Sequence, residues 1–165
     1  MMNDQTTDEQ KTAWLRNSVL ADELDASEVE TLARIMGSER LAGHEWLVSE
    51  GDARRTLFVL VAGRLDVLHH HEGVDSTVYR MSPGECAGTR AFVDGSPRKA
   101  GLRAARETVV LTLEPEDFEA LLADHPTLVF KVMRALFRIT HTNLMRANQE
   151  RDSLHNYVTR SHGRY

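Results

Sequence analysis

Residues 84–101 read GECAGTRAFVDGSPRKAG, and the interpretation of the whole chain starts from this segment. It begins at a Pro83-Gly84 turn and is followed by an extended run from Leu102. Gly88 lets a backbone approach a ligand closely, because glycine has no side chain. The next few residues have room for one helical turn, whose first N–H groups favour an anion, and the planar fork of Arg98 can grip oxygens. The segment therefore fits a phosphate site between two strands, or an ordinary connection of the same shape.

Short strand patterns lie on both sides of this segment. Residues 56–62 are rich in β-branched and aromatic side chains, and residues 64–68 alternate between polar and apolar as in a half-buried strand. Turn signals recur every eight to twelve residues or so, which is typical of an antiparallel sandwich or barrel. The strands are expected at residues 41–48, 56–62, 64–68, 77–81, 102–105 and 108–113.

Helical patterns flank the predicted strands. Two short helices are expected over residues 14–36, where Asp25 and Glu28 form a capping box and Gly37 ends the second helix. Acidic residues open a helix at 116–122, and one long helix is expected from Thr127 to about Val158. The fold class is therefore mainly β with flanking helices (α+β).

The long helix has an apolar stripe that approximates a heptad and is interrupted by Arg151. A small sandwich alone cannot cover so long a face, so the helix either pairs with a second copy of the chain or frays in its last turns. The stripe consists of Met133, Phe137, Thr140, Leu144, Ala147, Leu154 and Val158.

Composition limits the class of protein. At 165 residues, the chain suits one domain with a real core, and its 41% hydrophobic and 27% charged residues are typical of a soluble globular protein. No apolar run approaches the roughly 20 residues that a membrane span needs. The polar, acidic N-terminus is unlike a secretory signal. Because Cys86 is alone, no internal disulfide can form, and a cytoplasmic location is expected.

Charge is distributed unevenly. The net charge of −5 argues against a general nucleic-acid binder, which is usually basic. Cationic residues nevertheless gather around the 84–101 segment, which favours a small anionic ligand or, equally, a solvated basic face. These residues are Arg90, Arg98, Lys99, Arg103 and Arg106.

Several spaced residues together resemble the cyclic nucleotide-binding domain family. They are Gly43, Gly51, Asp52, Phe58, Gly63, Pro83, Gly84, Gly88, Pro97 and Arg98, and the likeness runs from about residue 15 to residue 144. The family includes catabolite-activator-type regulators, regulatory subunits of cyclic-AMP-dependent kinase and channel gating domains. The resemblance implies an eight-stranded antiparallel jelly roll, N-terminal helices and hinged C-terminal helices, with residues 84–101 as the phosphate-binding cassette. The expected organisation is a flexible leader (1–14), the domain (15–145), and a C-terminal helix extension and tail (146–165).

The match within the cassette is partial. The resemblance implies that Gly88 and Ala91 approach the phosphate and that Arg98 pairs with its charge. Family members have a glutamate that grips the ribose 2′-hydroxyl after the glycine, and this chain has Thr89. A hydrogen bond to a charged partner contributes about 1.5–3 kcal/mol, and Thr89 keeps one neutral hydrogen bond. We therefore expect cyclic nucleotides to bind weakly, with dissociation constants above the low-micromolar range.

Other positions extend the predicted site. Arg90 replaces the usual leucine and either supplies a second cation for a more highly charged ligand or points to solvent. Lys99 and Ala100 follow the phosphate arginine. In the family the long helix often contributes a base contact; Asn143 is the residue best suited to it here, unless it simply faces solvent.

Two further features have a functional and a plain interpretation. The histidines at 69–71 invite a metal site, but adjacent strand residues point to opposite faces, so a hairpin tip is the alternative. Cys86 is either a redox-sensitive thiol or a small buried apolar residue. No catalytic pattern stands out, so an enzyme is not expected.

We therefore expect a cytoplasmic sensor that binds a small anionic ligand such as cyclic AMP or cyclic GMP. A homodimer and a protein partner are expected, without a membrane. Direct DNA binding is not expected, because the sequence stops at Tyr165, too early for a helix-turn-helix module. The alternatives are a degenerate member that acts as an interaction scaffold, and the sensor half of a transcription regulator.

Overall fold

The computed structural model describes residues 6–161. Its strands are β1 (Gly37–Leu41), β2 (Trp46–Val48), β3 (Leu57–Ala62), β4 (Leu65–His71), β5 (Val74–Met81), β6 (Cys86–Ala87), β7 (Gly101–Ala104) and β8 (Thr108–Leu113). Its helices are α1 (Asp8–Arg16), η1 (Val19–Ala21), α2 (Ala26–Ile35), α3 (Thr89–Asp94), α4 (Pro115–Glu119), η2 (Ala120–Leu122) and α5 (Pro126–Ser161).

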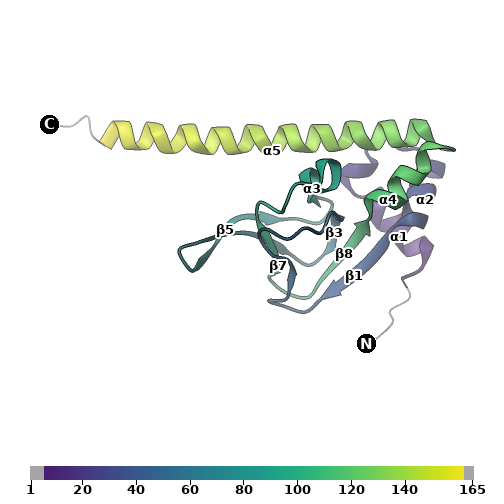
Figure 1. The fold of residues 1–165 in the computed structure, drawn as a ribbon, viewed down its shortest axis with the longest axis horizontal. Helices are drawn as coiled ribbons and strands as arrows, with labels where there is room; N and C mark the ends of the chain where they lie inside the picture. Colours follow the sequence, from purple (N-terminus) through teal and green to yellow (C-terminus); the bar gives the residue numbers. More distant parts are fainter. Residues whose placement is uncertain (1–5, 162–165) are drawn as a thin grey trace.

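The strands form two four-stranded antiparallel sheets. One sheet has the order β1-β8-β3-β6 and the other β2-β7-β4-β5. Helices from both ends of the chain cover the first sheet, and α5 extends along the whole molecule above the sandwich (Figure 1). This arrangement confirms the predicted antiparallel sandwich with N-terminal helices and a long C-terminal helix.

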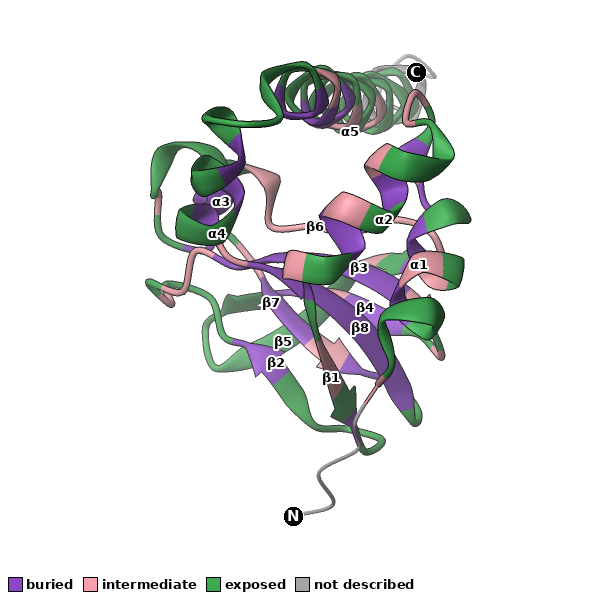
Figure 2. Ribbon diagram, turned by 90° about the vertical axis from the view of Figure 1, so that its right-hand side faces the viewer, coloured by how far each residue is buried: buried purple, intermediate pink, exposed green. Residues whose placement is uncertain are grey.

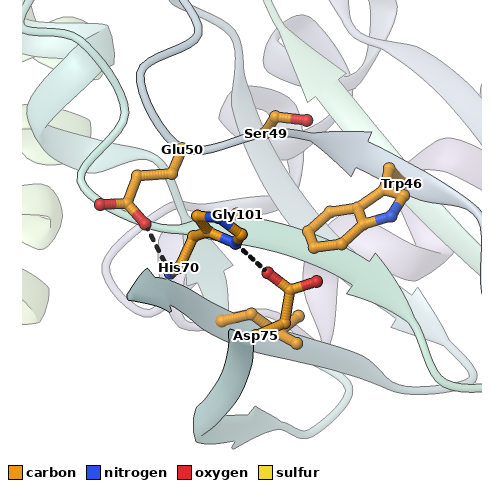
Figure 3. Close-up of a pocket in the computed structure, with 7 residues that line it drawn as sticks. Trp46, Ser49, Glu50, His70, Asp75 and Gly101 are labelled. Atoms are coloured by element: carbon orange, nitrogen blue, oxygen red, sulfur yellow. Dashed lines mark hydrogen bonds and ion pairs between the residues drawn. The ribbon is translucent and has the colours of Figure 1, made fainter. Parts of the chain in front are cut away.

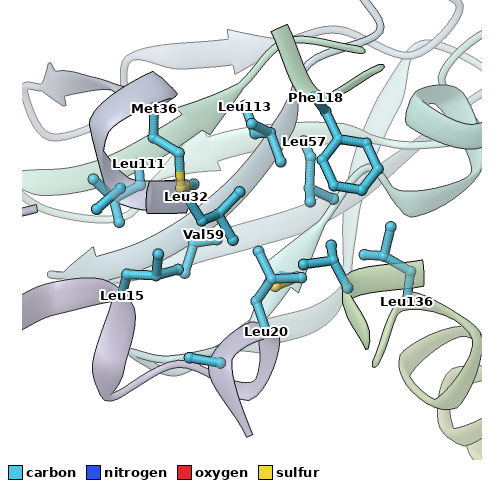
Figure 4. Packing of buried hydrophobic residues seen from close by; sticks show 14 of the residues in the cluster. Leu15, Leu20, Leu32, Met36, Leu57, Val59, Leu111, Leu113, Phe118 and Leu136 are labelled. Carbon is cyan, nitrogen blue, oxygen red and sulfur yellow. The ribbon is translucent and has the colours of Figure 1, made fainter. Parts of the chain in front are cut away.

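Alternation along β3 explains why its sequence is continuously apolar. Leu57 and Val59 pack against the helices, whereas Phe58 and Leu60 pack between the two sheets, because successive side chains point to opposite faces. Both faces are therefore buried. Figure 4 shows the helix-side cluster, in which side chains from α1, α2 and α5 meet the sheet. Fully burying a leucine of this kind stabilises the fold by about 1.5–3 kcal/mol.

The N-terminal region is more ordered than the sequence suggested. Helix α1 begins at Asp8, because the Thr7 hydroxyl accepts a hydrogen bond from the Gln10 N–H and the Gln10 side chain accepts one from the Thr7 N–H. Residues 8–14 of the expected leader are thus helical, and residues 1–5 lie outside the described residues. The capping box of Asp25 and Glu28 at α2 is confirmed.

The region expected to form one strand after the N-terminal helices forms parts of two strands. The prediction of one strand with a glycine turn over residues 41–48 was right about the turn at Gly43 but wrong about the single strand, since β1 ends at Leu41 and β2 begins at Trp46 in the other sheet. Between them His44 adopts a positive φ of 70°, which turns the chain. Strand β1 escaped notice because it lies at a sheet edge and its middle residues are polar.

The histidine segment is also a strand rather than a turn. Residues 69–71 belong to β4 and pair with residues 74–76 of β5. The turn has only two residues, Glu72 at φ 50° and Gly73 at φ 79°, which is the left-handed pair that a tight hairpin requires.

Helix α5 changes character along its length. Near its start, Leu128, Val132 and Leu136 are buried at four-residue spacing, so this part is anchored to the sandwich. Further along, Leu144, Leu154 and Tyr157 are 58–77% exposed. None of the helices within residues 6–161 combines the length and apolarity that a membrane span demands.

Candidate ligand site

A cavity of about 900 Å³ lies between the 84–101 segment, strands β4 and β5, and helix α5. Figure 2 looks along α5, with α3 and β6 beneath it. The eight residues that the sequence singled out for the site all line this one cavity; seven of them lie within residues 88–100, and the eighth comes from α5. They are Gly88, Thr89, Arg90, Ala91, Arg98, Lys99, Ala100 and Asn143.

Gly88 forms the point where β6 ends and α3 begins. Its backbone is left-handed, with φ 88° and ψ 18°, a conformation that favours glycine. A Cβ atom there would overlap Nη1 of Arg98 and lie 3.0 Å from the carbonyl oxygen of Thr56. Glycine is therefore required both by the backbone angle and by the guanidinium packed against it.

Arg98 is a buried cation with free hydrogen-bond donors. Its side chain is 6% exposed, and Nη2 donates to the carbonyl oxygen of Thr56 at 2.5 Å. The guanidinium lies 5.2 Å from the ring centroid of Phe58, while its Nε and Nη1 have no hydrogen-bond partner within the described part of the chain. Burial lowers the pKa of Arg98, yet a guanidinium stays protonated in proteins. Two donors of a buried charge thus lack an acceptor, and Arg98 lines the cavity.

The backbone around Arg98 is fixed by the neighbouring turn. The Arg98 N–H donates to the carbonyl oxygen of Asp52 at 3.0 Å, and the Gly51 N–H donates to the carbonyl oxygen of Arg98 at 2.8 Å. Hydrogen bonds through both the N–H and the carbonyl group of Arg98 therefore fix the backbone from which the guanidinium extends.

Helix α3 is held at its C-terminal end by a residue that sequence reasoning missed. Arg55 donates to the carbonyl oxygens of Ala91 and Phe92 at 3.4 and 3.2 Å, which satisfies acceptors at the end of the helix. Phe92 packs on Phe118 at 5.5 Å between ring centroids. No local sequence signal connects Arg55 to carbonyl groups 36 and 37 residues later.

Glu85 is one of two acidic residues that line the cavity, but it is already engaged. One oxygen accepts a hydrogen bond from the Tyr79 hydroxyl and the other from the Ser82 N–H, both at 2.6 Å. The hydrogen bond to Glu85, together with burial, raises the pKa of Tyr79. The other acid is Asp22, and position 89 offers a hydroxyl rather than a carboxylate.

Helix α5 supplies the opposite wall. The Arg146 guanidinium lies 3.8 Å from the ring centroid of Tyr79, and its Nη2 donates to Oδ1 of Asn143 at 2.9 Å. Asn143, the residue expected to contact a base, lines the cavity, but its side-chain oxygen already accepts a hydrogen bond from Arg146. Tyr79 and Arg146 were missed because they meet only through tertiary packing.

Arg90 lines the cavity while its side chain remains 61% exposed. Its Nε lies 3.9 Å from Asp94, one helical turn away, which is a weak surface pair. The sequence left open whether Arg90 faces the ligand or the solvent. In the structure its side chain borders the cavity and is also in contact with solvent.

Two of the three histidines line cavities, and these are different cavities. His69 lines the larger cavity, whereas His70 lines a second cavity of about 340 Å³ with Trp46, Glu50 and Asp75 (Figure 3). His70 Nδ1 lies 2.8 Å from Asp75, and the His70 N–H donates to Glu50 at 2.8 Å. No cluster of three metal-ligating side chains occurs among the residues that the structure describes.

Cys86 has the environment of a core residue. It is buried within the helix-side cluster, and burial raises the pKa of its thiol to about 12. The thiol is therefore neutral at physiological pH, which fits the buried apolar interpretation rather than that of a reactive thiolate.

Comparison with solved structures supports the same fold. A cyclic nucleotide-binding domain from Methylobacillus flagellatus superposes with a TM-score of 0.78 at 23% identity, covering 87% of this chain and 83% of that chain. The catabolite activator protein of Thermus thermophilus gives a TM-score of 0.73 at 25% identity, covering 83% of this chain and 63% of that chain.

The curated relatives found by sequence are longer proteins, and the region that matches this chain is less than a third of each of the two described next. A cAMP-dependent protein kinase regulatory subunit from Blastocladiella emersonii is 28% identical over 123 residues, which are 72% of this chain and 30% of that protein. An uncharacterized NTE family protein from Mycobacterium tuberculosis is 26% identical over 125 residues, 76% of this chain and 21% of that protein. The family model of the cyclic nucleotide-binding domain matches residues 38–125, more than half of the chain. The chain therefore belongs to the cyclic nucleotide-binding domain family, a family of regulatory domains.

Proposed function

We propose that this chain is a cytoplasmic sensor domain that binds a cyclic nucleotide or a related phosphate ligand and relays binding through α5. The observation that supports this function most strongly is Arg98, a buried guanidinium with two unpartnered nitrogens at the 900 Å³ cavity. Leaving a charged donor buried without a partner is costly. Phosphate oxygens would satisfy both nitrogens, each through a hydrogen bond worth about 1.5–3 kcal/mol.

The remaining walls suit the organic part of a nucleotide. Apolar side chains from both sheets and from α5 face the cavity beside its charged groups, and apolar walls of this kind are usual in small-molecule sites. These apolar side chains include Val67, Met81, Leu102, Ile139 and Leu144.

Recognition of the ribose is the weak part of the site. Thr89 offers one neutral hydroxyl where family members have a glutamate, and the nearby Glu85 has both oxygens engaged. Losing a charged acceptor reduces affinity by roughly tenfold to a hundredfold. We therefore expect cyclic AMP and cyclic GMP to bind with dissociation constants above the low-micromolar range and with little discrimination against 2′-deoxy analogues.

The relay would use α5, which borders the cavity over residues 135–147 and is anchored by its buried first turns. A ligand that contacts this wall shifts the population of helix positions by its differential affinity for them. Exposed apolar side chains on α5 support a homodimer or another protein as the receiving surface. They are Phe130, Phe137, Leu144, Leu154 and Tyr157.

Isothermal titration calorimetry with cyclic AMP and cyclic GMP tests the proposal. Arg98→Ala should abolish binding, while Arg103→Ala serves as the control, because Arg103 stacks on Trp46 outside this cavity. Unchanged binding by Arg98→Ala would place the site elsewhere. Low-micromolar or tighter binding by the wild type would contradict the argument from Thr89.

The second candidate function is an interaction scaffold that binds no nucleotide. Thr89 and the exposed apolar face of α5 favour it, whereas the free nitrogens of Arg98 oppose it. Absence of binding at millimolar nucleotide, together with a dimer that Phe137→Glu disrupts in sedimentation velocity, would select this alternative.

A further inference from the structure

The larger cavity carries more positive charge than a cyclic phosphate can neutralise. Five Lys and Arg residues line it against the two acids Asp22 and Glu85, which gives a formal charge of +3. The chain as a whole has a net charge of −5. A cationic cavity within an acidic protein concentrates the electrostatic field on its ligand.

Two of these five cations have carboxylate partners. Arg138 lies 3.1 Å from Glu23, and Arg90 lies 3.9 Å from Asp94. The other three are Arg98, Lys99 and Arg146, and among residues 6–161 no ion pair joins any of them to a carboxylate. The Arg98 guanidinium donates to the carbonyl oxygen of Thr56 and has Asp52 and Glu114 as its acidic neighbours, whereas Arg146 donates to the amide oxygen of Asn143 and interacts with Tyr79.

These three cations lie at two ends of the cavity. Leu102 of β7, four residues beyond Arg98, pairs with Val67 of β4, which pairs with Tyr79 of β5. Two strand spacings, about 10 Å, therefore separate Leu102 from Tyr79. Since Arg146 stacks on Tyr79, its charge lies two strands away from Leu102, which follows the end of the segment that holds Arg98 and Lys99.

We infer that the preferred ligand of this cavity is a nucleotide-like phosphate ester with two or more negative charges, whose additional charge is held by Lys99 and Arg146. The inference rests on the proposed function, because it uses the same cavity. A cyclic phosphodiester carries about one negative charge, whereas a terminal phosphate monoester carries about 1.5 to 2 at pH 7. Thr89 in place of a carboxylate removes the group that would repel the extra charge next to Gly88.

A series of adenosine phosphates at constant ionic strength tests this inference with the nucleoside unchanged. Calorimetric titrations would compare cyclic AMP, 5′-AMP and ADP, with pyrophosphate as a probe that lacks the nucleoside. We expect ADP to bind about tenfold or more tightly than cyclic AMP at low salt, and this preference to shrink as salt screens the charges. Pyrophosphate should bind more weakly than ADP, because the apolar walls contribute nothing to it.

The variants Arg146→Gln and Arg151→Gln locate the additional charge. Arg146 lines the cavity, whereas Arg151 is an exposed cation on the same helix outside it. Arg146→Gln should weaken ADP about fivefold and cyclic AMP less than about twofold, and Arg151→Gln should change neither. Circular dichroism checks that α5 persists in both variants.

Each outcome decides the matter. Cyclic AMP binding as tightly as ADP, with both lost in Arg98→Ala, would overturn the charge inference while the proposed function stands. An equal loss of both nucleotides in Arg146→Gln would show that Arg146 contacts the base or ribose instead, which also overturns it. Pyrophosphate binding as tightly as ADP would overturn the nucleotide-like part. No binding of any probe would contradict the proposed function itself.

Discussion

The two cavities on either side of β4 each have a histidine and acidic side chains in their lining, but they differ in how their polar groups are satisfied. The smaller one, beside His70, has its polar groups paired: His70 with Asp75 at 2.8 Å, and Glu50 with the His70 N–H at 2.8 Å. The larger one, beside His69, contains the buried Arg98 with two unpartnered nitrogens. An unsatisfied buried charge distinguishes a candidate ligand site better than a concentration of polar side chains does.

Exposure reinforces the contrast. The side chains of His70 and Asp75 are 58% and 37% exposed, so water already solvates them and a ligand would gain little. Trp46 occupies much of the remaining space, since a Cβ on Gly101 would lie 2.6 Å from its ring. Arg98, in contrast, is shielded from water, and a ligand would supply partners that water does not.

The largest expected effect comes from filling the space beside Arg98. Gly88→Ala should abolish ligand binding and destabilise the fold, because the new methyl group overlaps the guanidinium at a left-handed φ. Gly73→Ala is the matched control, with φ 79° and no atom within 4 Å. It should show only the strain of about 1–2 kcal/mol and retain binding. Chemical denaturation measures the loss of stability and calorimetry the loss of ligand affinity. If both losses were equal in the two variants, Gly88 would be no different from a glycine in an ordinary turn.

Restoring a carboxylate at position 89 should sharpen the contrast by strengthening the larger cavity. Thr89→Glu is expected to tighten cyclic AMP by about tenfold or more through the ribose 2′-hydroxyl, with no gain for 2′-deoxy cyclic AMP. Calorimetry with the two ligands measures the difference. Thr89→Gln controls for size without the charge, and an equal gain with this variant would contradict the argument from the charged acceptor.

The dependence of stability on alkaline pH tests whether the Cys86 thiol, which lines the larger cavity, is buried. Its folded-state pKa of about 12 exceeds the usual value, so the stability contributed by the neutral thiol is complete below about pH 8.5 and is lost as pH rises toward 12. Between pH 9 and 10.5 the wild type should lose about 1 kcal/mol more per pH unit than Cys86→Ala in urea denaturation. Identical pH slopes would show that the thiol titrates normally.

Substitutions in the smaller cavity should have little effect on stability or on nucleotide affinity. His70→Gln removes the ring that contacts Asp75, yet the cost should stay within about 0.5 kcal/mol because the site is exposed. Nucleotide affinity should stay within twofold of the wild type. A tenfold loss of affinity would indicate that the two cavities act together.

Much of the fold was predictable from the sequence because its signals are local. The apolar run of β3, the capping box of Asp25 and Glu28, and the unbroken helical run of α5 each depend on neighbouring residues. Strand β1 was not predictable in this way, since its polar residues at a sheet edge lack the pattern of burial. The His69–His71 strand was missed because histidine and a following glycine are equally typical of a turn.

The site divides in the same manner. The cassette residues lie within one contiguous segment, so spacing grouped Gly88 with Arg98, and the family resemblance added Ala91. Tyr79 and Arg146 are brought together only by the packing of α5 over β5, and their cation–π contact leaves no mark on either local sequence. Roles toward a ligand remain predictions for all of these residues.

The most direct test of the central claim compares both cavities in one experiment. A titration of ¹⁵N-labelled protein with cyclic AMP and ADP reports the backbone N–H of Gly88 and Thr89, the Arg98 Nε–H, and the indole N–H of Trp46 in the smaller cavity. We predict saturable shifts at Gly88, Thr89 and Arg98, and no shift at Trp46. Shifts confined to Trp46 and its neighbours, or no shift at any of these groups, would contradict the assignment of the ligand site to Arg98.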